Sequence, residues 1–175
     1  EDSSRMIIIA GGASYGGKAG VGAGVAFNLI SNHTKAWMDS VGIVHGGLLD
    51  LSALNDSEIY AFAASGGFSK DNLGLAASIA INLILNSAEA YMINVHTPIG
   101  ETSAGLSLSA KDESTIWSLA GAVGGSKKVG IGAAVAFNWI QNTIQAYMDT
   151  VALDSSGAIA LSAEEISQIR TLSAG

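Results

Sequence analysis

An internal repeat constrains the fold of this chain more than any other feature of its sequence. Three fifteen-residue segments align without gaps, at offsets of 54 and 56 residues: Phe27–Val41, Ile81–Val95 and Phe137–Val151. The first and the third are identical at eight of their fifteen positions. Self-similarity at a fixed long period is typical of stacked arrays, in which each unit buries its apolar surface against its neighbours.

A second set of equivalent segments supports the same period. Its members are Leu49–Ala53, Leu106–Ala110 and Ile159–Ala163, and an isoleucine follows each of them six residues later, at Ile59, Ile116 and Ile169. Residues 3–12 resemble the tail of a preceding unit. We therefore expect one repeat domain over residues 1–175, truncated at both ends, with a partial repeat at 1–17 and repeats at about 18–66, 67–124 and 125–175.

Alternation of large and small residues predicts that each unit consists of β-strands. In the first copy, a set that includes Val21, Val25 and Phe27 alternates with a small set that includes Gly20 and Gly22. A helix with glycine at every second position would lose ~1 kcal/mol per glycine relative to alanine. Because both sets are apolar, we expect the strand to be covered on both faces, with another layer approaching the small face closely.

The strand that follows alternates again, and two further strands are expected in each unit. Ala36 and Met38 should point inward, whereas Lys35, Trp37 and Asp39 should point outward. The further strands lie around Leu49–Ala53 and Ser57–Ala64, and the expected links are Gly46-Gly47, Gly66-Gly67, Asp71-Asn72, Gly124-Gly125 and Asp154–Gly157. The predicted fold is all-β, a parallel β-helix or β-solenoid of about three repeats of ~55 residues. Whether one copy forms one long coil or two short rungs stays open.

Two sets of asparagines recur at equivalent strand positions. Asn28, Asn82 and Asn138 form the first set, and Asn32, Asn86 and Asn142 follow four residues later. Equivalent positions of stacked strands lie ~4.8 Å apart, so each set is expected to form a ladder of amide-to-amide hydrogen bonds. Such bonds satisfy polar groups that are otherwise costly to bury. The predicted role is structural; ligand or metal binding by these amides is the remote alternative.

Trp37, Tyr91 and Tyr147 are predicted to form an aromatic column on the outer surface. Stacked rings on a β-surface mainly stabilise cross-strand packing. A flat aromatic strip also suits the binding of sugar rings, so a ligand-contact column is the alternative.

The glycine-rich turn at Gly12–Lys18 almost matches a phosphate-binding loop. Ala19, however, stands where a serine or threonine would hold magnesium, and no helix pattern follows. The repeat counterpart at Gly121–Lys127 indicates a turn between strands instead. We therefore predict no nucleotide site and no cofactor.

No catalytic or metal-binding constellation is recognisable among the remaining residues. The histidines, His33, His45 and His96, lie at non-equivalent positions without ligand spacing. Acidic residues are scattered in turns, where Asp71-Asn72 and Asp154 are the possible calcium contacts, although no calcium loop is present. The sequence thus favours a protein that is not an enzyme and holds no metal.

Composition argues against several further classes of function and structure. The net charge is −7 with eight Lys and Arg residues, which argues against nucleic-acid binding. Charged residues make up only 13% of the chain, but the apolar stretches are interrupted before the ~20 residues that a membrane-spanning helix requires. The chain has no cysteine and hence neither a disulfide nor a thiolate site.

The three repeat units resemble the tandem repeats of very large bacterial surface proteins. The motif that carries the resemblance is a small-apolar alternation ending in Ala-x-Asn-x-Ile-x-Asn and followed by Ala-aromatic-Met, as at residues 26–38. Proteins with such repeats include filamentous and leukotoxin-type adhesins and autotransporter passenger domains, some of them virulence factors. The resemblance implies a β-solenoid located at the bacterial cell surface or in the medium.

It also implies a structural stalk that stacks on neighbouring repeats of a longer parent chain. The alternative is a directly adhesive module that binds host glycan or matrix protein through exposed aromatic residues. Tyr60, Phe62 and Phe68 are the best candidates for exposed aromatics that break the repeat pattern, although Tyr60 and Phe62 also suit a core. A weaker alternative is self-association, edge to edge, into filaments.

Overall fold

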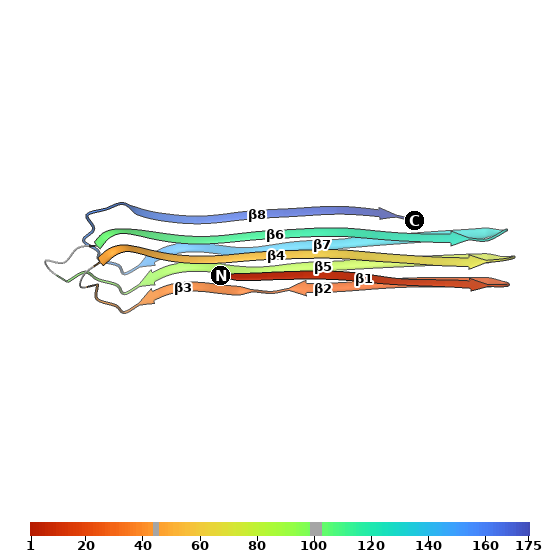
Figure 1. Cartoon of the computed structure of the whole chain (residues 1–175), viewed down its shortest axis with the longest axis horizontal. Helices are drawn as coiled ribbons and strands as arrows, with labels where there is room; N and C mark the ends of the chain where they lie inside the picture. The colour runs from red at the N-terminus through yellow and green to blue at the C-terminus, as the bar shows by residue number, and fades with distance from the viewer. Residues whose placement is uncertain (44–45, 99–102) are drawn as a thin grey trace.

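The computed structural model describes residues 1–43, 46–98 and 103–175, and within these ranges the chain is all-β. Its strands run side by side along one long axis (Figure 1). The described strands are β1 (Asp2–Gly16), β2 (Ala19–Ile30), β3 (His33–Asp39), β4 (Gly46–Ser69), β5 (Leu73–Ile93), β6 (Ser103–Gly125), β7 (Val129–Asp149) and β8 (Ile159–Ala174).

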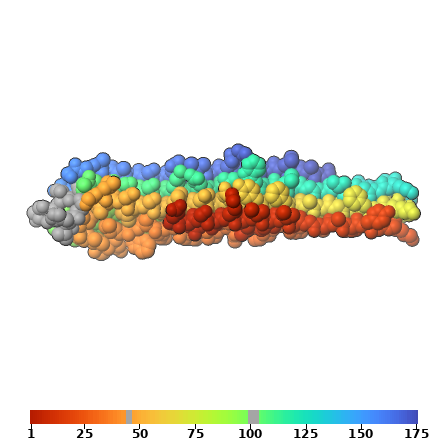
Figure 2. Space-filling model, in the orientation of Figure 1, coloured from red at the N-terminus to blue at the C-terminus, as the bar shows by residue number. Residues whose placement is uncertain are grey.

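The strands form two parallel sheets. The order in the first, called here the β4–β6 sheet, is β1-β4-β6-β8. In the second, the β5–β7 sheet, β5 pairs with β7 along one edge and with both β2 and β3 along the other. Apart from β2 and β3, which lie in the same sheet, successive strands belong to alternate sheets, and the strands of the two sheets run in opposite directions (Figure 1). In Figure 2 the strands of the β4–β6 sheet appear as successive bands from red to blue.

Strand register follows the repeat alignment of the sequence. Phe27 pairs with Ile81, and Ile81 pairs with Phe137, in parallel ladders that continue without a bulge from β2 to β5 and from β5 to β7. Leu49, Leu106 and Ile159 are likewise partners across β4, β6 and β8. The predicted equivalence of the two sets of segments is therefore confirmed as strand pairing.

A strand of the β4–β6 sheet together with the strand or strands that follow it in the β5–β7 sheet is called here a coil. The expectation of separate short strands at Leu49–Ala53 and Ser57–Ala64 was wrong, because β4 runs through both as a single 24-residue strand. Gly66-Gly67 and Gly124-Gly125 lie within β4 and at the end of β6, and do not link strands. The links at this end of the coil lie instead at residues 17–18, 70–72 and 126–128.

The alternation predicted for β2 is present, but its large residues face outward. Burial alternates strictly along β2, with Gly20, Gly22 and Gly24 on the buried side and the large residues on the exposed side. Phe27 is 62% exposed. The expectation that β2 is covered on both faces was therefore wrong within the described chain.

Close approach of the two sheets explains why the small residues are inside. A Cβ atom at Gly22 would lie 2.1 Å from the carbonyl oxygen of Gly66 in the other sheet, and one at Gly12 would lie 2.2 Å from that of Ala23. Backbones this close leave no space for a side chain between them, so glycine is required on the inner surface and the bulky side chains remain outside.

The interior changes character along the strands. Next to the glycine-lined part lies a cluster of alanines around Ala63 and Ala80, followed by a cluster of isoleucines around Ile59 and Ile84. The largest cluster, around Met92 and Leu108, lies at the other end. Here Ala36 and Met38 pack against the core, and Trp37 faces outward, as predicted. Two polar layers, described below, separate these clusters.

The corners that follow β3, β5 and β7 repeat one backbone conformation. Ser40, Asn94 and Thr150 occupy equivalent positions and have φ angles of 55°, 52° and 53°. Their main-chain amides also connect successive copies: Ser40 N–H donates to the carbonyl of Ile93, and Asn94 N–H donates to that of Asp149. The left-handed conformation at this position therefore belongs to the repeat, although only asparagine among the three residues favours it.

Candidate functional site

The first asparagine set forms a ladder inside the molecule. The Nδ2 of Asn28 donates to the Oδ1 of Asn82 over 2.5 Å, and the Nδ2 of Asn82 donates to the Oδ1 of Asn138 over 2.6 Å. Asn82 is fully buried and also donates to Ser118 Oγ in the opposite sheet over 3.2 Å. The Asn82 amide thus binds both neighbouring coils and the facing sheet, which ties the two packing directions together.

The second asparagine set is arranged differently from the prediction. Its side-chain oxygens accept from main-chain amides of the preceding coil, as in the 3.2 Å bonds from Asn32 N–H to Asn86 Oδ1 and from Asn86 N–H to Asn142 Oδ1. Its Nδ2 groups cross the interior to the other sheet instead of reaching the next amide. Asn86 donates to Ser57 Oγ and to Asp112 Oδ2, each over 2.9 Å.

Asp112 is a buried polar residue that the sequence reasoning missed. The acidic residues were expected in turns, but Asp112 lies in β6 with no exposed surface. Its Oδ1 accepts from Asn142 Nδ2 over 2.6 Å and from Ser114 Oγ over 2.5 Å. The register places it in line with Asp2, Asn55 and Glu165, which form a column facing the second asparagine set. The alignment of the second set of segments contained this signal.

The aromatic column lies on the outside of the β5–β7 sheet. Trp37 pairs in register with Tyr91, and Tyr91 with Tyr147. The two tyrosine rings stack with centroids 5.0 Å apart and planes 8° apart. Because each ring covers a face of the other, this pair offers mainly ring edges to a ligand. The geometry favours the packing interpretation of the tyrosines over the sugar-binding one.

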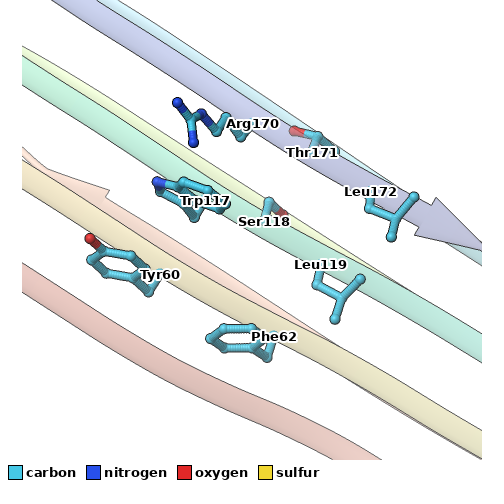
Figure 3. Close-up of a pocket in the computed structure, with 8 residues that line it drawn as sticks. All are labelled: Tyr60, Phe62, Trp117, Ser118, Leu119, Arg170, Thr171 and Leu172. Atoms are coloured by element: carbon cyan, nitrogen blue, oxygen red, sulfur yellow. The ribbon is translucent and has the colours of Figure 1, made fainter.

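An apolar groove of about 360 Å³ lies on the outside of the β4–β6 sheet. Tyr60 and Phe62 contribute from β4, whereas Trp117 and Leu119 come from β6 and Arg170 and Leu172 from β8 (Figure 3). Tyr60, Trp117 and Arg170 are register partners. Of the three aromatics singled out in the sequence, Tyr60 and Phe62 line this groove, and Phe68, 42% exposed, lies outside its lining.

Two arginines stand at the aromatic rings of this surface. The guanidinium of Arg170 lies 4.5 Å from the ring centroid of Trp117, and that of Arg5 lies 5.5 Å from the ring of Tyr60. Arg5 also binds Glu58 over 2.6 Å, and the hydrogen bond from Arg5 to this carboxylate raises the pKa of the arginine. The surface therefore combines aromatic side chains with an arginine over a ring at either side.

Partial burial and acidic neighbours disfavour the ionised form of Asp56, which lies in β4 of the same sheet. Desolvation raises the pKa of Asp56 above its ordinary 3.8, and the charges of Glu58 and Glu113 add to this rise. A raised folded-state pKa means that ionised Asp56 destabilises the fold at neutral pH. This cost is absent well below pH 3.8 and appears as the pH rises from there through the folded-state pKa.

Asp56→Asn is therefore expected to stabilise the protein at pH 7 by ~0.5 kcal/mol, a small value because the group is largely exposed to screening solvent. Urea titrations of both proteins at pH 7 and below pH 3.8 measure the difference. It should disappear at the acidic pH, and an equal gain at both pH values would contradict the electrostatic cause.

Other ligand classes find little support in the described part of the chain. No three His, Asp or Glu side chains within it are grouped so as to hold a metal ion. Residues Gly12–Gly16 belong to β1, and only the two residues before β2 form the turn. His33 and His96 are exposed, while His45 lies outside the described residues. The described residues also contain no helix with the length and apolar character needed to span a bilayer.

Comparison with known proteins found no match: no family model, no curated protein and no solved structure matches the chain.

Proposed function

We propose that the chain is a structural repeat segment, a β-solenoid of about three ~55-residue repeats that stacks on neighbouring repeats of a longer parent chain. On the resemblance of its repeat units, we place that parent among secreted or cell-surface bacterial adhesins. In this role the segment supplies rigidity and resistance to proteolysis and performs no catalysis.

The observation that carries this proposal is the end of the first asparagine ladder. The Nδ2 of Asn28 continues the ladder toward Asn82, but its Oδ1, although buried, has no hydrogen-bond partner among the described residues. A buried unpaired oxygen is unfavourable by ~1–3 kcal/mol. The amide of an asparagine in a preceding coil would donate to this oxygen, just as Asn28 itself donates to Asn82.

The edges of the two sheets support stacking as well. Strands β1 and β8 lie at the two edges of the β4–β6 sheet, so each has one side without a strand partner among the described residues. Such edges pair readily with another strand. Because every described pairing is parallel and in repeat register, one more coil can be added at either edge with the same hydrogen bonds.

Duplicating one coil tests the proposal. A chain in which residues 72–127 are inserted a second time after residue 127 should gain stability, because a stacked array adds one coil–coil interface for each added coil. We expect a higher midpoint of thermal unfolding and the same β-type circular dichroism per residue. A duplicated coil that lowers the midpoint, or that is digested by protease while the rest survives, would contradict stacking.

A second candidate function, direct adhesion, is favoured by the groove on the β4–β6 sheet. Unlike the stacked tyrosines, Tyr60 and Phe62 lie beside each other on one strand and line an open groove (Figure 3). If the groove binds a glycan or matrix protein, Tyr60→Ala with Phe62→Ala should reduce binding to an array of such ligands at least tenfold. The matched control is Trp37→Ala with Tyr91→Ala and Tyr147→Ala on the other sheet. No binding by the folded wild type would exclude this function for the segment.

A further inference from the structure

One part of the outer surface of the β5–β7 sheet is formed entirely by apolar side chains. It consists of the outward-facing residues of segments 19–30, 73–84 and 129–140, and is called here the apolar face. These three segments contain no charged residue and no histidine. Its side chains are open to solvent, with Val25 65% and Val135 57% exposed. Contiguous exposed apolar surface of this kind marks an interaction site.

We propose that the apolar face binds the same face of a second copy of the chain, in an antiparallel face-to-face dimer. The first argument is the order of side-chain sizes along β2. In the first coil the outward residues near the link are small, Ala19 and Ala23, and those further along are large, Phe27 and Leu29. When two such faces meet with their strands antiparallel, small residues of one lie opposite large residues of the other.

In the second and third coils this complementarity holds for the pair next to the two-fold axis but not for every pair. With the two-fold axis at the buried position between residues 23 and 25, each coil meets the same coil of the partner. The opposed positions are 19 with 29, 21 with 27 and 23 with 25 in the first coil, 73 with 83, 75 with 81 and 77 with 79 in the second, and 129 with 139, 131 with 137 and 133 with 135 in the third. An alanine faces Val25, Ile79 or Val135 in every coil, and Val129 faces Trp139. Such self-complementary contacts are those of an isologous two-fold interface.

The area of the face is sufficient for a specific contact. Twelve residues span ~40 Å and three strands span ~14 Å, so each copy contributes about 550 Å². The two copies together bury about 1,100 Å², close to the ~1,000 Å² above which an interface is considered specific. The dimer of this segment is therefore expected to be reversible, and it would strengthen with each coil that a longer array adds.

A bilayer is a less suitable occupant. Within the described ranges, β2 and β7 each have one side without a strand partner, and hydrocarbon offers no hydrogen bonds to the main-chain N–H and C=O groups there. Such groups face water or another strand when the sheet is covered by a second protein sheet.

Oligomeric state is the first test, with the 175-residue chain at a series of concentrations in sedimentation velocity. We expect a concentration-dependent species of twice the 17.7 kDa chain mass. Val25→Glu with Val135→Glu should abolish it. The control, Ile9→Glu with Val123→Glu, places two glutamates at exposed sites of the opposite sheet, where the wild-type side chains are 82% and 60% exposed, and should leave the dimer intact. Circular dichroism confirms that both variants fold.

Cross-linking tests the orientation in a chain that has no natural cysteine. Leu73→Cys and Leu83→Cys face each other only in the antiparallel dimer, whereas like residues lie ~33 Å apart along the strand direction. A short bis-maleimide should link a mixture of the two variants but neither variant alone. Self-linking of either variant, a monomeric wild type, or a dimer that only the control disrupts would overturn the proposal. Flotation of the monomer with lipid vesicles would do the same, in favour of a membrane surface.

Discussion

Gly67→Ala is expected to lower the free energy of unfolding by ~3 kcal/mol or more, the upper range for overpacking. A Cβ atom at Gly67 would lie 1.6 Å from the carbonyl oxygen of Leu75 in the facing sheet. Both atoms belong to strands held by pairing on either side, so no side-chain rotation relieves the clash and the sheets must separate locally. Urea denaturation followed by far-ultraviolet circular dichroism measures the loss.

Gly121→Ala is the matched control for this substitution. Gly121 lies in β6 of the same sheet, but a Cβ atom there meets no atom within 4 Å. Its register partners, Ala64 and Ala174, are already alanines. We expect a change within ~0.5 kcal/mol, the usual size for an uncrowded surface position. Equal losses in both variants would show that the close approach of the sheets is not what requires Gly67.

Asn82→Ala should destabilise the protein by ~3 kcal/mol, because it leaves a buried amide group of Asn28 and a half-buried one of Asn138 unpaired, at ~1–3 kcal/mol for a buried group. Asn28 Nδ2 loses its acceptor and Asn138 Oδ1 loses its donor. The hydroxyl of Ser118 loses a donor as well. The same denaturation measurement reports the effect, and protection of neighbouring amides from hydrogen exchange should fall in both adjoining coils.

Replacement of the whole ladder separates unpaired amides from simple loss of contacts. In the triple variant Asn28→Leu, Asn82→Leu and Asn138→Leu, no amide of the ladder is left without a partner, and the side-chain volume is nearly retained. The triple variant is therefore expected to lose less stability than Asn82→Ala alone. A loss in the triple variant several times that of the single one would refute this account.

Register and fold class were accessible from the sequence because the copies align without insertions within each segment. The offsets between Phe27, Ile81 and Phe137 became the ladder pairs of three strands. In a parallel stack, equivalent residues of successive repeats meet, so an alignment of repeats is also a table of strand partners. The outward position of Trp37 followed in the same way from alternation along the strand.

Which face of β2 lies inside the molecule could not be predicted from the sequence in the same way. Alternation separates Val25 and Phe27 from Gly22 and Gly24 but does not say which set faces the other sheet. That depends on the distance between the sheets, a tertiary property set jointly by glycines such as Gly22 and Gly66. For the same reason Gly66-Gly67 resembled a link, although these glycines are required within a strand whose neighbour is so close.

The second asparagine set shows a similar limit. Its recurrence at Asn32, Asn86 and Asn142 indicated burial, but the acceptors of its Nδ2 groups come from the opposite sheet. Which residue of β6 faces Asn86 depends on how the two sheets are positioned relative to each other along the strand direction. The sequence alignment of the repeats gives the strand partners within a sheet but not this relative position. For that reason the sequence did not show that Asp112 faces the second asparagine set.

The length of β4 determines how a longer array of such coils would use its residues. A 24-residue strand spans ~80 Å, whereas each added coil raises the stack by only ~4.8 Å. About a thousand residues would make roughly eighteen coils of ~55 residues, a panel nearly as wide as it is tall. Each coil enlarges either side of that panel by ~380 Å² while it adds only ~4.8 Å of height, so a longer array gains broad flat surface with little added height.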